Sequence, residues 1–97
     1  MRKRGTMEEA ELEEFINKPV VVDTATPLIY IGTLHEVGTS FLTLKDVDVH
    51  HIDRGGVCKE TYALSTKKFG IKKNRMSTKI RIDIITSISH LEDIVEY

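Results

Sequence analysis

The stretch LIYIGTLHEVGTSFLTL, residues 28–44, constrains the fold more than any other part of the chain. Its β-branched, aliphatic and aromatic residues are typical of strands, and the Val-Gly-Thr-Ser sequence at 37–40 is typical of a turn. We therefore predict strands over residues 28–36 and 41–49. Gly32 interrupts the first of them, where the missing Cβ permits a sharp bend or the close approach of another backbone segment.

The strand at 41–49 changes its apolar face partway along. Leu42 and Leu44 share one face, whereas Val47 and Val49 fall on the other, because side chains alternate between the two faces of a strand. A regular strand cannot change its buried face in this way. We therefore predict a bulge or strong bend near residues 45–46, of the kind that barrel corners need.

The rest of the chain supplies a helix and three further strands. Apolar residues at helical spacing, followed by Asn17 and Pro19, predict a helix over residues 7–16. The remaining segments are predicted to be strands at 20–22, 59–66 and 79–89, a hairpin turn at 53–56, an irregular connection at 69–76, and a final turn of helix or an edge strand at 91–97. Together they predict a mainly β fold, a small closed five-stranded bent antiparallel barrel of SH3-like type with an N-terminal α-helix.

Size and composition limit the class of protein. The 97 residues, 40% hydrophobic and 30% charged, suit one globular domain, which we place at 7–97 after a flexible N-terminus at 1–6. No apolar run approaches the roughly 20 residues of a membrane helix, and the basic N-terminus lacks the apolar region of a secretory signal. Cys58 is the single cysteine, which favours a reducing, cytoplasmic location.

Charge is segregated along the chain. Residues 67–81 hold seven Lys or Arg and no acidic residue, so the rest of the chain carries seven basic and fifteen acidic residues. Such a positive segment can attract phosphates; the alternative is a solvated, lysine-rich surface, with Phe69 and Ile71 anchoring the connection to the core. The candidate RNA-binding residues are Lys67, Lys68, Phe69, Lys72, Lys73, Arg75, Lys79, Arg81, Asp83 and Phe41.

Catalytic and metal chemistry find little support. The possible metal ligands are His35, His50, His51, Cys58, Asp46, Asp48 and Asp53, but they lack a CxxC, HxH or HExxH spacing. No nucleophile turn or oxyanion loop accompanies Cys58, and no glycine-rich nucleotide motif is present. We expect neither enzymatic activity, nor a metal, nor a cofactor.

The order of elements and two short motifs resemble the Sm-like (LSm) family. Ile31-Gly32-Thr33-Leu34 followed by Val37 is similar to the first Sm motif, and residues 80–85, IRIDII, look like a degenerate second motif. The sequence departs from family members that bind uridine-rich RNA, because residues 38–40 replace their loop Asp and Asn, and Ile82 replaces a Gly. Arg81 is retained and would contact a base, and the base-stacking position falls near Ser40 or Phe41.

The resemblance implies assembly as well as a fold. Sm-like chains pair the fourth strand of one subunit with the fifth of the next and close a ring of six or seven subunits, which removes exposed sheet edges. We therefore expect a non-enzymatic ring of identical chains that binds RNA through its basic segment, with no membrane partner. The alternative is a structural or protein-interaction barrel that assembles without nucleic acid.

Overall fold

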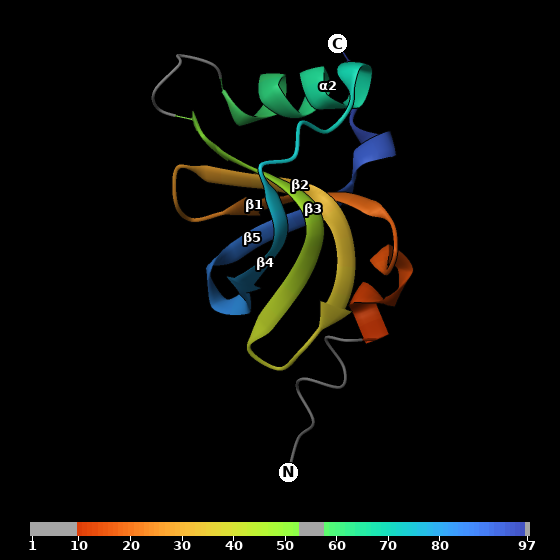
Figure 1. Ribbon diagram of the computed structural model, residues 1–97, viewed down its shortest axis with the longest axis vertical. Helices are drawn as coiled ribbons and strands as arrows, with labels where there is room; N and C mark the ends of the chain where they lie inside the picture. The colour runs from red at the N-terminus through yellow and green to blue at the C-terminus, as the bar shows by residue number, and fades with distance from the viewer. Residues whose placement is uncertain (1–9, 53–57, 97) are drawn as a thin grey trace.

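The protein forms one five-stranded antiparallel sheet (Figure 1). The computed structural model describes residues 10–52 and 58–96. The strands are β1 (Pro19–Thr24), β2 (Leu28–Val37), β3 (Phe41–His51), β4 (Arg75–Arg81) and β5 (Ile85–His90), in the spatial order β4-β3-β2-β1-β5. The helical elements are η1 (Glu13–Phe15), α2 (Lys59–Phe69), η3 (Ile82–Ile84) and η4 (Leu91–Asp93).

Within the described residues the sheet is open, because β4 and β5 lie at its two ends and each pairs there with one neighbour only. Mainly β architecture with five antiparallel strands is confirmed, while closure of the sheet within one chain is not observed. The predicted hairpin turn at 53–56, the N-terminus at 1–6 and the first residues of the predicted helix, 7–9, lie outside the described residues.

The N-terminal segment is helical where it is described. Residues 10–12 are helical and run into η1. Leu12, Phe15 and Ile16 pack against the core, as their spacing predicts. The segment ends at Asn17, whose φ of 66° turns the chain just before Pro19 begins β1.

The predicted irregularity in β3 is present at Asp46, which has a φ of 52°. In the β2–β3 ladder Ile31 lies opposite Asp48 but Thr33 lies opposite Lys45, so β3 holds one extra residue there. Because of this bulge, Val47 returns to the face that carries Leu44, and both are fully buried in one cluster.

Gly32 lies at the same bend, and its missing side chain is a packing requirement. A Cβ at this position would be 2.9 Å from the Lys45 carbonyl oxygen and 3.1 Å from the Val47 Cα. Both contacts are with backbone, which cannot swing away. The close backbone approach predicted at Gly32 is therefore confirmed.

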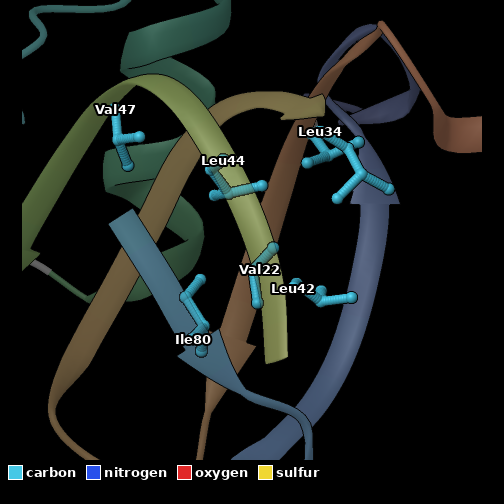
Figure 2. Close-up of a cluster of buried hydrophobic side chains, with 7 residues drawn as sticks. Val22, Leu34, Leu42, Leu44, Val47 and Ile80 are labelled. Carbon is cyan, nitrogen blue, oxygen red and sulfur yellow. The ribbon is translucent and has the colours of Figure 1, made fainter. Parts of the chain in front are cut away.

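Apolar side chains bury both faces of the central strands. Figure 2 shows the larger cluster, in which Val22, Leu34, Leu42, Leu44, Val47 and Ile80 converge from β1, β2, β3 and β4. A second cluster on the opposite face joins Val21, Ile29 and Ile31 to Ala63 of α2. Because neighbouring residues of β1 point to opposite faces, Val21 and Val22 serve different clusters.

The strand predicted at residues 59–66 is wrong, because this segment is the first part of α2. Its Ala, Leu, Glu and Lys residues are good helix formers, and Glu60 and Lys67 suit the two ends of the helix dipole. Gly70 follows the last turn with a φ of 95° and donates its N–H to the Thr66 carbonyl. The wrong prediction relied too heavily on the two-residue spacing of Tyr62 and Leu64.

The single strand predicted at residues 79–89 is also wrong, because η3 divides it into β4 and β5. β4 begins at Arg75, inside the segment predicted to be irregular. The Ile82 N–H donates to the Ser40 carbonyl (2.8 Å), and the Ala25 N–H donates to the Ile84 carbonyl (2.8 Å). These two hydrogen bonds to residues in other turns hold η3, the break between β4 and β5, in place. The regular spacing of the isoleucines gives no sign of that break. Of the two alternatives predicted for residues 91–97, the turn of helix is closer to the structure, which has a 3-10 turn there, η4.

Candidate nucleic-acid interface

The basic segment 67–81 does not form one continuous surface in the structure. Its cations fall into three groups, which are Lys67 and Lys68 at the end of α2, Lys72 and Lys73 in the connection, and Arg75, Lys79 and Arg81 on β4. Each group has different neighbours, so each has a different capacity to meet a phosphate.

The two lysines of α2 are engaged with the C-terminal segment. Lys67 Nζ donates to the Ile94 carbonyl (2.6 Å), and Lys68 Nζ pairs with the Glu96 carboxylate (3.0 Å). Phe69 beside them is 76% exposed, so its predicted anchoring role is wrong, while Ile71 does pack against the cluster under α2. A phosphate at this site would compete with an existing carboxylate.

Asn74 holds the connection between α2 and β4 against β3. This residue was not identified from the sequence. Its side chain accepts the Val49 N–H (3.1 Å) and donates to Asp48 (3.2 Å), while its own N–H donates to the Val47 carbonyl (2.8 Å). Lys73 pairs with Asp46 (3.1 Å). Lys72 is exposed and has no carboxylate partner among residues 10–52 and 58–96.

The β4 cations occupy alternate positions of an edge strand. Arg75, Lys79 and Arg81 fall on one side of β4, opposite the buried Ile80. Within the described part of the chain, Arg75 and Lys79 form no ion pair with a carboxylate. These two cations are therefore the ones most available to an external anion.

A Phe, an Arg and an Asp lie at the corner between β3, β4 and η3. Phe41 lies directly opposite Arg81 in the β3–β4 ladder, and Arg81 Nη2 pairs with the Asp83 carboxylate (2.6 Å). Phe41 is 43% exposed, and both charged side chains are exposed. We call this group the Phe41–Arg81–Asp83 corner; it joins Phe41 to two candidate residues that are far from it in sequence.

A buried polar cluster fixes α2 to the sheet. Asp48 of β3 is only 3% exposed and accepts hydrogen bonds from the Tyr62 hydroxyl and the Asn74 amide. The His50 ring stacks on Tyr62 with centroids 3.8 Å apart. Burial, followed by the adjacent Asp48 carboxylate, raises the pKa of Tyr62 above its usual range. Tyr62 is therefore a hydrogen-bond donor rather than a nucleophile.

The sequence candidates for metal and thiol chemistry are scattered. Over the described ranges 10–52 and 58–96, no three His, Cys, Asp or Glu side chains gather in a metal-binding arrangement; Asp53 lies outside them. Cys58 is exposed at the start of α2, and a hydrogen bond with the Thr61 side chain lowers the pKa of its thiol.

No protein-family model matches the chain, and no curated protein matches it in sequence. Among the helices that are described, none has the length and apolar character needed to cross a membrane.

Proposed function

We infer that the protein is a non-enzymatic, ring-forming Sm-like protein that binds single-stranded RNA. In this proposal each subunit offers one base-stacking site at the Phe41–Arg81–Asp83 corner. The observation that carries the RNA proposal is the pairing of Phe41 with Arg81 across the β3–β4 ladder.

The strand order supports the assembly part of the proposal. β4 and β5 are the two edge strands, and they are the two strands whose pairing between subunits the Sm-like resemblance implies. Met76 of β4 is 71% exposed at such an edge. Open, partly apolar edges favour strand pairing with another chain, so a ring would bury what a single chain leaves exposed.

The local geometry around Gly32 supports the family resemblance. The residue that matches the glycine of the first Sm motif lies where a Cβ would come within 2.9 Å of the β3 backbone. The bent third strand, the five strands and the N-terminal helical segment fit the same layout. α2 is an addition to that layout, between β3 and β4.

The chemistry of the corner suits an unpaired base. A half-exposed Phe ring provides a stacking surface for any base, while the planar guanidinium of Arg81 can stack or donate to base edges and phosphates. Asp83 orients that guanidinium. Since residues 38–40 supply no carboxylate or amide, we expect weak discrimination between bases.

Repetition around a ring would strengthen a weak site. A strand of RNA bound at one corner would find the next corner at high effective concentration, so affinity would grow with each subunit engaged. Lys72 of each subunit would add a phosphate contact, and binding would weaken steeply as salt is raised.

Two measurements test the proposal. Light scattering after size exclusion should give a mass of about six or seven subunits. Fluorescence anisotropy with labelled single-stranded RNA should show binding that Phe41→Ala and Arg81→Ala each weaken by about tenfold, in line with 1–3 kcal/mol per stacked base. Lys68→Ala, which removes a cation away from the corner, is the control. A ring that binds no RNA would favour the protein-interaction alternative.

A further inference from the structure

A cavity of about 460 Å³ lies between α2, the face of β1 and β5 that carries Val21 and Ser89, and the C-terminal segment. Its floor is apolar and includes Val21, Ile29 and Ala63, which also belong to the cluster under α2. Ser87 and Ser89 of β5 line its side. The cavity therefore reaches β5, the edge strand that, in the part of the chain the structure describes, pairs with β1 alone.

The cavity carries acidic side chains that are not all neutralised. Asp23 pairs with Lys59 Nζ (2.5 Å), which also donates to the Thr24 and Thr26 carbonyls. Glu60 and Asp93 line the same cavity, and neither forms an ion pair with a cation in residues 10–52 or 58–96. Two exposed carboxylates thus line the same cavity as Ser87 and Ser89 of β5.

The opposite edge of the sheet has the complementary pattern. Arg75 and Lys79 of β4 lack carboxylate partners among the described residues and lie on the side away from the core. Met76 is exposed and lies on the same side of β4 as the buried Ile80. β4 is thus basic on one side and apolar on the other.

Strand alternation links the two edges. If β4 of a second copy extends the sheet beyond β5, its side chains continue the two faces of that strand, about 4.8 Å away. The side of that β4 that carries Met76 would then lie on the same face as Ile88, which packs against the core. The side that carries Arg75 and Lys79 would lie on the same face as Ser87 and Ser89, which line the acidic cavity.

We propose that this cavity is a docking site for Arg75 and Lys79 of a second copy's β4, which pair there with Glu60 and Asp93. The inference rests on the proposed assembly and deepens it, because it names the side chains that select the partner strand. α2 thereby becomes an assembly element, since it contributes Glu60 and one wall of the cavity. The cations of β4 then divide, with Arg75 and Lys79 serving assembly and Arg81 serving RNA.

Charge reversal and rescue test the pairing. The variant Glu60→Lys/Asp93→Lys should fall to monomer mass in light scattering while its circular dichroism spectrum stays that of the original chain. Combining it with Arg75→Glu and Lys79→Glu in one chain should restore the assembled mass, because the opposite charges again face each other. Glu11→Lys/Glu13→Lys, which reverses two exposed charges on the N-terminal segment, is the matched control and should leave the mass unchanged.

The outcomes separate the two proposals. If the original chain is itself a monomer, the proposed assembly and this docking site both fail. If the original chain assembles and Glu60→Lys/Asp93→Lys keeps the full mass, the docking site is wrong and the ring proposal stands. A folded, monomeric Glu60→Lys/Asp93→Lys chain that the second pair of reversals cannot rescue also overturns the pairing.

Discussion

The Tyr62 hydroxyl on α2 donates a hydrogen bond to the Asp48 carboxylate, which is buried on β3. These residues come from two elements that share no backbone ladder, so the bond ties the helix to the sheet. Asn74 donates to the other oxygen of the same carboxylate and ties in the strand connection as well. A buried carboxylate is costly unless such donors surround it.

Removing that donor should destabilise the protein. Tyr62→Phe leaves the Asp48 carboxylate without one of its two side-chain hydrogen bonds, and we expect the free energy of unfolding to fall by about 1–3 kcal/mol. Urea denaturation followed by circular dichroism measures the change. Tyr30→Phe, at a partly buried position whose hydroxyl forms no hydrogen bond with the described residues, is the control and should cost less. Equal losses of stability in the two variants would show that the hydrogen bond from Tyr62 to Asp48 does not stabilise the protein.

Stability should also depend on alkaline pH through Tyr62. Its pKa is raised in the folded state by burial and by Asp48, whereas in the unfolded chain it titrates near 10. The stabilisation is therefore complete below about pH 10 and is lost as pH rises above that value, because the unfolded state releases the proton more readily. Denaturation midpoints between about pH 8 and 11 should fall less steeply in Tyr62→Phe than in the original chain.

Gly32 should tolerate no side chain. Gly32→Val places a Cβ 2.9 Å from the Lys45 carbonyl oxygen, and its branched methyl groups crowd the β3 bulge further. We expect a loss of several kcal/mol, as overpacking of a core produces, and a lower melting temperature. Gly38→Ala is a milder comparison, since its Cβ would approach the Phe41 carbonyl oxygen at 3.3 Å. An unaltered melt for Gly32→Val would contradict this account of the bend.

The connection before β4 offers a test of the phosphate contacts. Reversing Lys72 and Lys73 to Glu should abolish RNA binding without unfolding the chain, because both side chains are exposed. Lys73→Glu also places a carboxylate near Asp46, its present partner at 3.1 Å, which strengthens the repulsion of phosphate. Fluorescence anisotropy measures affinity and circular dichroism measures folding. Unchanged affinity would remove this segment from the RNA-binding surface.

Local patterns in the sequence were sufficient where the structure depends on neighbours along the chain. The slip of the apolar period between Leu44 and Val47 predicted the bulge, and Gly32 predicted the close approach, because strand faces alternate residue by residue. The helix over residues 59–69 was missed although its signals were present, since Glu60, Lys67 and Gly70 mark its ends. The two-residue spacing of Tyr62 and Leu64 led to the prediction of a strand there instead.

The candidate sites depend on contacts that no local pattern encodes. Phe41 lies opposite Arg81, 40 positions away in sequence, only because β3 and β4 pair in one particular register. The basic segment is continuous in sequence, but a helix end, a connection and an edge strand carry it to three places with different partners. The chain by itself determined its first three strands, its bend and its charge pattern, because these follow from residue type and spacing. Only the tertiary structure decided which charges remain unpaired, because burial and pairing are properties of the packed chain.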